Sequence, residues 1–174
     1  MKKVTYLTES AKKFSREEAI AEAKRCLLCE EAYCNKKCPI NSNPKEFVKL
    51  VATEQFDKAI GLIRDNNPLF YSICTRVCPY DSYCVGGCRN SKLADDPIMI
   101  PFIQKYLVDY CDETDEIISS GNVEPKKVGQ KVAIIGSGPA GLAAAAVLGQ
   151  KGYEVTVFEA KKEVGGWLSY GIPP

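Results

Sequence analysis

The sequence predicts two architectures in one chain: a helical N-terminal region and, after a linker, the start of an α/β domain. Up to about Tyr110 apolar residues recur at helical spacing, whereas from Lys131 onward two short apolar strands flank an alanine-rich helix. The segment between them contains Gly, Ser and Pro without an apolar period, as linkers do. We therefore expect a helical domain over residues 1–111, a linker over 112–130 and the N-terminal βαβ portion of an incomplete α/β domain over 131–174.

Capping and periodicity signals place the helices of the first region. Ser15 and Glu18 form a capping box at the start of SREEAIAEAKRCLLC, and we expect this helix to carry the first two cysteines at its C-terminal end. Asn43 and Pro44 open a second helix, and Pro68 stops a third, FDKAIGLIRDN. A fourth is PFIQKYLVDY. The apolar residues expected in these helices are Ala19, Ile20, Ala23, Leu27, Phe47, Val48, Val51, Phe102, Ile103, Tyr106, Leu107 and Tyr110.

Eight of the nine cysteines fall in two short runs. The first run, RCLLCEEAYCNKKCP, has the spacing C-x2-C-x4-C-x3-C-P, and the second, ICTRVCPYDSYCVGGC, also contains Cys-Pro and lies on predicted turns. Four crowded cysteines that end in Cys-Pro are typical of iron-sulfur ligation in bacterial ferredoxins, where the fourth cysteine binds the other cluster. The runs hold Cys26, Cys29, Cys34 and Cys38, then Cys74, Cys78, Cys84 and Cys88, while Cys111 stands apart.

Two other uses of clustered cysteines remain open. A disulfide framework belongs to exported domains, but the segment KKVTYLTESAKKF lacks the apolar stretch of a signal peptide, so we expect a cytoplasmic protein with reduced thiols. Structural zinc sites are the second alternative, although zinc ribbons usually pair two short C-x2-C knuckles. A zinc-stabilised docking module is therefore the competing interpretation of function. The sequence has no histidine, which excludes Rieske ligation and histidine-based catalysis.

Charge and hydropathy indicate which partners to expect. A formal net charge of +1 gives no field that attracts nucleic acid or a membrane surface. No stretch approaches the run of about 20 apolar residues that a membrane span needs. We expect small molecules and proteins as partners, and neither nucleic acid nor a membrane.

A glycine-rich loop lies between the first strand, KVAIIG, predicted to be buried, and the alanine-rich helix. On its own the frame G-x-G-x-x-G is also that of an ordinary turn, but here an acidic residue ends the second strand, YEVTVFE, about 20 residues further on. The glycines would permit a tight turn and close approach of a pyrophosphate, and the carboxylate would bind ribose hydroxyls, which favours FAD or NAD over NADP. The predicted cofactor-binding residues are Gly136, Ser137, Gly138, Pro139, Ala140, Gly141, Glu159, Gly166 and Trp167.

Together these motifs resemble the NAD(P)H-oxidising subunits that contain FAD and iron-sulfur clusters. The resemblance rests on the two cysteine runs, KVAIIGSGPAGLAAA and VGGWLSYGIP, and covers the whole chain. The family includes the glutamate synthase small (beta) subunit, dihydropyrimidine dehydrogenase with its bacterial two-subunit equivalent, and related ferredoxin:NADP oxidoreductases. The resemblance implies two 4Fe-4S clusters in the helical domain, FAD at the glycine-rich loop, and NAD(P)H as the electron donor.

The resemblance also implies how the ligands divide between the clusters. One cluster takes three cysteines of the first run and one of the second; the other takes a non-cysteine ligand from the last helix, a glutamine in the pyrimidine branch and a glutamate in the glutamate synthase branch. The implied ligands are Cys26, Cys29, Cys34 and Cys88 for one cluster, and Cys38, Cys78, Cys84 and Gln104 for the other. Simple counting would instead place Cys74 in the position of Gln104, and this alternative stays open.

Two short motifs, GGWL and IQKY, resemble the bacterial pyrimidine subunit. In that branch the resemblance implies an FMN-containing partner subunit that reduces uracil or thymine; in the other branch the partner is the glutamate synthase large subunit. No residue of this chain is predicted to bind a pyrimidine or to act as a catalytic residue. A flavin domain needs further strands beyond Pro174, so we expect a fragment or a split subunit that binds FAD weakly and is inactive alone.

Overall fold

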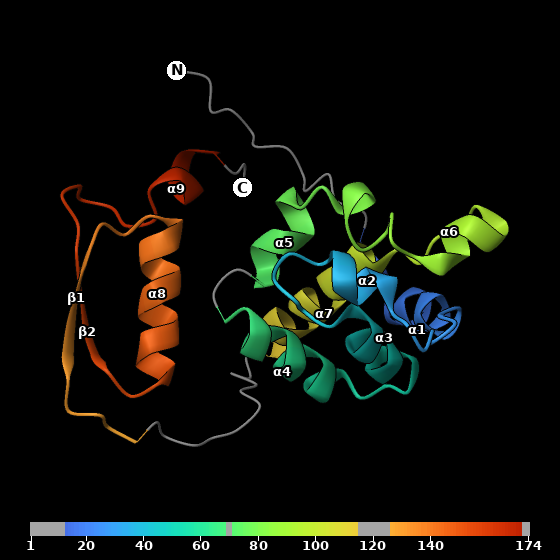
Figure 1. Cartoon of the computed structure of the whole chain (residues 1–174), viewed down its shortest axis with the longest axis horizontal. Coiled ribbons are helices and arrows are strands. Elements are labelled where there is room, and N and C mark those ends of the chain that lie inside the picture. The colour runs from blue at the N-terminus through green and yellow to red at the C-terminus, as the bar shows by residue number, and fades with distance from the viewer. Residues whose placement is uncertain (1–12, 69–70, 115–125, 172–174) are drawn as a thin grey trace. The chain divides into compact units, whose positions relative to one another are not determined.

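The computed structural model describes residues 13–68, 71–114 and 126–171 (Figure 1). The chain divides into two compact units, one of residues 11–121 and another that contains residues 122–174. The first unit is helical, and the second contains a small parallel sheet. The predicted fold class, a helical domain followed by the start of an α/β domain, is therefore confirmed.

Seven α-helices form the described part of the first unit, and the predicted capping box is present at the first of them. The Glu18 N–H donates to Ser15 Oγ at 3.2 Å, and the Ser15 N–H donates to the Glu18 carboxylate at 2.8 Å. The helices are α1 (Arg16–Lys24), α2 (Tyr33–Lys37), α3 (Pro44–Ala52), α4 (Phe56–Asn66), α5 (Tyr71–Val77), α6 (Arg89–Ala94) and α7 (Ile100–Thr114), with a 3-10 turn at Tyr80–Ser82.

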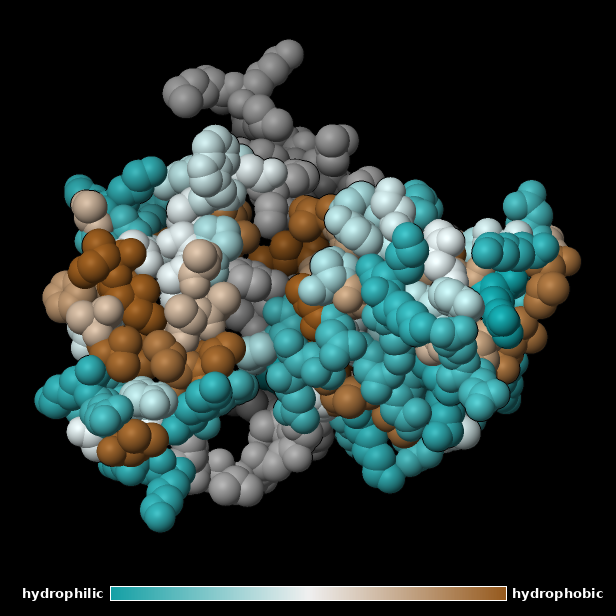
Figure 2. Space-filling view, in the orientation of Figure 1, coloured by the Kyte–Doolittle hydropathy of each residue, from teal (hydrophilic) through white to brown (hydrophobic). Residues whose placement is uncertain are grey.

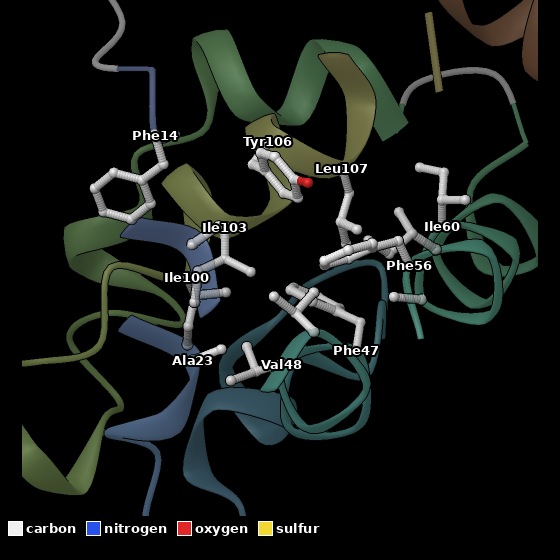
Figure 3. Close-up of a cluster of buried hydrophobic side chains, with 14 of the residues drawn as sticks. Phe14, Ala23, Phe47, Val48, Phe56, Ile60, Ile100, Ile103, Tyr106 and Leu107 are labelled. Carbon is white, nitrogen blue, oxygen red and sulfur yellow. The ribbon is translucent and has the colours of Figure 1, made fainter. Parts of the chain in front are cut away.

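The core of the helical unit lies where α1, α3, α4 and α7 pack together (Figure 3). Phe47 and Val48 of α3, Ile60 of α4, and Ile103 and Leu107 of α7 are all buried in one cluster. Full burial of each such side chain contributes about 1.5–3 kcal/mol relative to exposure. The apolar faces predicted for α3 and α7 are confirmed, because the residues at helical spacing are those that meet in the core.

Two details of the sequence interpretation are wrong near the cysteines. Helix α1 ends at Lys24, before the cysteines, and Leu27 is 52% exposed. Leu28 has a left-handed conformation (φ 48°), so no helix continues through to Cys29. The second cysteine run does not begin on turns either: Cys74 lies within helix α5, and the turns follow it. Helices α2 and α6 were also missed, since five and six residues are too few to show a clear apolar period.

The second unit is a βαβ arrangement of β1 (Lys131–Ile135), α8 (Pro139–Gln150) and β2 (Glu154–Phe158), followed by a short helix, α9 (Trp167–Gly171). The strands pair in parallel, with Lys131 opposite Glu154 and Ile135 opposite Phe158. Helix α8 packs against both strands. This connection is the one that parallel strands require.

The strands of this unit are half-buried rather than buried. Exposed and half-buried residues alternate along β1 and β2, and Ile135 is 83% exposed, so the expectation that KVAIIG is a buried strand is wrong. Within this unit and among the described residues, α8 is the helix that packs against the sheet. Figure 2 shows apolar residues on the surface of this unit, in brown, while the visible face of the helical unit is mostly hydrophilic.

Candidate iron-sulfur and dinucleotide sites

One pocket of the helical unit is lined by thiols from both cysteine runs. Cys26, Cys29 and Cys34 come from the first run and Cys88 from the second, around about 450 Å³ of space that is partly open to solvent. The structure therefore groups the four cysteines that the resemblance assigns to one cluster.

A second pocket, with about 500 Å³ of such space, is also lined from both runs. It contains Cys38 of the first run and Cys78 and Cys84 of the second. Both candidates for the remaining ligand, Cys74 and Gln104, line it as well. Pro44 and Ile100 line both pockets, so the two spaces share a wall.

A pair of glycines in the second run permits its close approach to the first run. At Gly87 a β-carbon would lie 3.1 Å from the Tyr33 carbonyl oxygen and 3.0 Å from Lys37 Cγ, both on α2. At Gly86 a β-carbon would lie 2.0 Å from the carbonyl oxygen of Asp81, a distance that backbone atoms do not tolerate. Glycine at both positions thus allows the turn to close against α2 and to bring the following cysteine to the first pocket.

The chemistry of the pockets follows from crowding thiols in partly buried positions. Burial first, and then negative charge on Cys26 and Cys88, raise the pKa of Cys34 to about 11. In the second pocket burial raises the pKa of Cys84 to about 12, with added contributions from Cys78 and Cys38. Such thiols resist ionisation unless a bound cation compensates their charge. The donor sets therefore fit a group that carries several iron ions.

The cysteines of the two pockets form no disulfide, and their thiols line a space rather than converge on a single metal position. None of the nine cysteines forms a disulfide. Among residues 13–68, 71–114 and 126–171, no three Cys, Asp or Glu side chains lie close enough together to hold a single metal ion. In a 4Fe-4S cluster the cysteines bind different irons, so the ligands surround a space, as the thiols do in both pockets.

The side-chain amide of Gln104 is held by a hydrogen bond from its nitrogen. Its side chain is 8% exposed, and its Nε2 donates to the main-chain carbonyl of Tyr71 at 2.9 Å. The other atom of the amide, Oε1, accepts no hydrogen bond from the described residues. Gln104 lines the second pocket, which places its amide beside the thiols of Cys38, Cys78 and Cys84. The competing thiol, Cys74, instead accepts a hydrogen bond from Asn67 Nδ2 at 3.4 Å.

In the βαβ unit the glycine-rich loop joins the end of β1 to the start of α8. Gly136 has φ +92°, a left-handed conformation that favours glycine, and at Gly141 a β-carbon would lie 2.0 Å from the Gly136 carbonyl oxygen. Gly138 caps α8 and Pro139 is its first residue, so the helix N-terminus opens at the loop. Free N–H groups at a helix N-terminus favour binding of a phosphate there.

Glu159 follows β2 directly and is tied to the loop. Its Oε2 accepts hydrogen bonds from Ser137 N–H at 2.8 Å and from Ser137 Oγ at 2.5 Å, and its Oε1 accepts one from the Lys161 N–H at 2.9 Å. The Ser137 hydroxyl first, and then these backbone N–H groups, lower the pKa of Glu159 from 4.5 to about 2. A carboxylate has about four acceptor positions, so three bonds leave capacity for a ribose hydroxyl.

The Gly-Gly loop lies against the glycine-rich loop. A β-carbon at Gly166 would lie 3.1 Å from Gly138 Cα, and the Gly165 N–H donates to the Ser137 carbonyl at 3.0 Å. Trp167, the first residue of α9, is 77% exposed and meets Tyr170 edge to face at 6.4 Å between ring centroids. The nine predicted cofactor-binding residues thus lie in the segments 136–141, 159 and 166–167, of which the Gly-Gly loop and Glu159 both contact the glycine-rich loop.

Sequence reasoning did not find three residues that contact the second pocket's polar groups: Ser42, Asn67 and Tyr71. Tyr71 acts through a main-chain carbonyl, which no side-chain pattern reveals. Ser42 had a weak signal, because a hydroxyl four residues after a cysteine can reach back to the sulfur across a tight loop. No helix in the described ranges is both long and apolar enough to cross a membrane.

Comparison with known proteins is consistent with this geometry. Residues 3–116 match the family described as dihydropyrimidine dehydrogenase domain II, 4Fe-4S cluster, and residues 134–171 match the NAD(P)-binding Rossmann-like domain. Among curated proteins, the NAD-dependent dihydropyrimidine dehydrogenase subunit PreT of Salmonella typhimurium is 41% identical over 99% of this chain and 41% of its own length. The glutamate synthase [NADPH] small chain of Escherichia coli is 39% identical over 92% of this chain and 33% of its own length.

This chain thus spans about two fifths or less of the relatives that it matches. The match to the 4Fe-4S family covers the helical unit with both cysteine pockets, and the second match begins in β1 and ends in α9. The chain therefore belongs to the dihydropyrimidine dehydrogenase domain II family of 4Fe-4S proteins.

Proposed function

We propose that this chain is the electron-transfer part of a flavin and iron-sulfur oxidoreductase, in which electrons from NAD(P)H and FAD reach a partner active site through two 4Fe-4S clusters. The observation that carries the proposal is the presence of two adjacent pockets, each lined by thiols from both cysteine runs. Two pockets that share a wall are the arrangement that electron transfer between two clusters needs.

The residues assigned to each group combine the division that the resemblance implies with the pockets and the loop, and Cys74, which also lines the second pocket, stays the alternative to Gln104. One cluster would be held by Cys26, Cys29, Cys34 and Cys88, the other by Cys38, Cys78, Cys84 and Gln104, and FAD would lie at residues 136–141 with its ribose at Glu159. When bound, iron-sulfur clusters accept and release single electrons at potentials set by charge, hydrogen bonds and exposure.

The chain's own contribution to electron transfer is to orient ligands and to limit water. Burial keeps the Cys34 and Cys84 thiols partly away from solvent, and the apolar side chains of Pro44 and Ile100 separate the two pockets. The Tyr71 carbonyl orients the Gln104 amide. In the βαβ unit, the loop N–H groups and the Glu159 carboxylate would hold the phosphates and the ribose of a dinucleotide.

Within the family we favour the pyrimidine branch, with an FMN-containing partner subunit that reduces uracil or thymine. Gln104 supports this choice, because the resemblance places a glutamine at this position in that branch and a glutamate in the glutamate synthase branch. The match to PreT also extends over slightly more of the chain than the match to the glutamate synthase small chain. Glutamate synthase small subunit remains the second candidate, with the large subunit as its partner.

The proposal is tested on the full-length protein purified without oxygen. We expect a brown protein with iron and sulfide in equal amounts, an electronic absorption that bleaches on addition of NADH or NADPH, and bound FAD. Reduction of uracil by the complex with the FMN-containing subunit would support the pyrimidine branch, and ammonia-independent glutamate formation with the large subunit would support the other. A colourless protein that contains only zinc would refute the proposal in favour of a docking module.

A further inference from the structure

The loop between α2 and α3 places a serine against the sulfur of Cys38. The Ser42 N–H donates to Cys38 Sγ at 3.4 Å, and the Ser42 hydroxyl lies 3.2 Å from the same sulfur. Ser42 is 4% exposed, so water does not compete for these contacts. One cysteine of the second pocket thus has two polar contacts from a single buried residue.

The surrounding loop fixes this geometry through three asparagines. Asn41 and Asn43 flank the serine and both have left-handed backbone conformations, with φ 52° and 53°, which asparagine tolerates better than most residues. The side chain of Asn35 then bridges the loop to α3, because its Nδ2 donates to Asn43 Oδ1 at 2.7 Å and its Oδ1 accepts the Lys45 N–H at 2.9 Å. The contact to sulfur is therefore built into the loop.

We infer that Ser42 raises the reduction potential of the cluster bound by Cys38, an inference that rests on the proposed function. A metal-bound cysteine has no proton, so the hydroxyl must donate to the sulfur. An added electron makes the cluster and its sulfur ligands more negative, and a donor to sulfur therefore stabilises the reduced form more than the oxidised form. Ser42 is in this sense a positioning residue that acts through Cys38.

The experiment compares Ser42→Ala with the parent full-length protein in an EPR-monitored redox titration without oxygen. We expect one of the two cluster midpoints to become more negative, with the other unchanged and the iron content intact. The ratio of oxidised to reduced cluster at a fixed potential should rise about tenfold, which equals about 59 mV for a one-electron couple. Ser42→Thr keeps a hydroxyl and should restore the parent midpoint.

Ser82→Ala is the matched control, because Ser82 is exposed, lies in the second cysteine run and makes no side-chain hydrogen bond to the described residues. Its midpoints should equal those of the parent. Unchanged midpoints in an iron-loaded Ser42→Ala protein would overturn the inference alone. Loss of iron from Ser42→Ala would also overturn it, since the hydroxyl would then hold the site together rather than set its potential. A parent protein without iron and sulfide would instead refute the proposed function.

Discussion

Gln104 is the residue at which the two possible ligand sets of the second pocket can be separated by mutation. Replacement by Leu removes both ends of the amide while it keeps a side chain of similar size at a buried position. Replacement by Glu removes the N–H donor but keeps an oxygen that can bind iron. Both variants lose the 2.9 Å bond to the Tyr71 carbonyl, so loss of that bond does not by itself explain a difference in iron content between them.

The magnitude of the shared effect follows from that hydrogen bond. A partly buried carbonyl that loses its hydrogen-bond donor lowers the free energy of unfolding by about 1–3 kcal/mol. In a domain of about 100 residues each kcal/mol lowers the midpoint of thermal unfolding by about 4–8 °C. We therefore expect Gln104→Leu and Gln104→Glu to share this loss, and only Gln104→Leu to lose one of the two clusters, which halves the iron content.

Iron and sulfide analysis with low-temperature EPR distinguishes the outcomes, and Cys74→Ser completes the set. If Gln104 is the fourth ligand, Cys74 binds no iron, so we expect Cys74→Ser to keep both clusters. The Glu variant should keep both as well, with a more negative potential for one because its ligand adds a negative charge. Full iron content in Gln104→Leu together with cluster loss in Cys74→Ser would refute the assignment and favour an all-cysteine site.

Three further predictions follow from the described contacts. Cys88→Ala should remove the cluster that Cys88 shares with the first run, and full iron content would contradict the pairing. Glu159→Ala in the full-length protein should lower flavin occupancy without changing iron content. An NMR titration of the Glu159 carboxyl should give a midpoint near pH 2, and Ser137→Ala should raise this midpoint toward 4.5. Since folding lowers the pKa of Glu159, the hydrogen bonds to its carboxylate stabilise the folded state fully above about pH 4.5. This stabilisation is lost as the pH falls through about 2. Gly141→Ala should destabilise the βαβ unit by about 1–3 kcal/mol and reduce flavin binding, whereas Gly149→Ala, in the same helix with open space around its β-carbon, should be neutral or stabilising; equal unfolding midpoints for the two would contradict the clash with Gly136.

The fold was largely predictable because its helices and strands obey local rules. A capping box marks the start of α1, proline marks the start of α3, and apolar residues at helical spacing mark the core-facing sides of α3 and α7. The short helices α2, α5, α6 and α9 were not predicted, because each has at most seven residues and a weak apolar period. The exposure of Ile135 was missed for another reason: an apolar strand sequence does not reveal which layers cover it.

The candidate site was predictable in its residue types but not in its grouping. Spacing within RCLLCEEAYCNKKCP indicates cluster chemistry, yet it cannot show that Cys88 joins the first three cysteines while Cys38 joins the second run. That grouping depends on Gly87, which lets the second run approach α2, on Gly86, which lets the second run close on Asp81, and on the loop that carries Cys38 to the second pocket. The hydrogen bonds from Ser42 and Tyr71 depend on backbone positions that only the fold determines.

The short helices beside the two pockets contribute few residues to the apolar core. No residue of α2 or α6 is buried, and in α5 only Thr75 is. Helices this short are marginal without tertiary support, whereas α1, α3, α4 and α7 are fixed by the core. Bound clusters would connect the two groups of segments, because each pocket takes thiols from both runs. If clusters bind as proposed, their ligand bonds should therefore stabilise these short segments against the core.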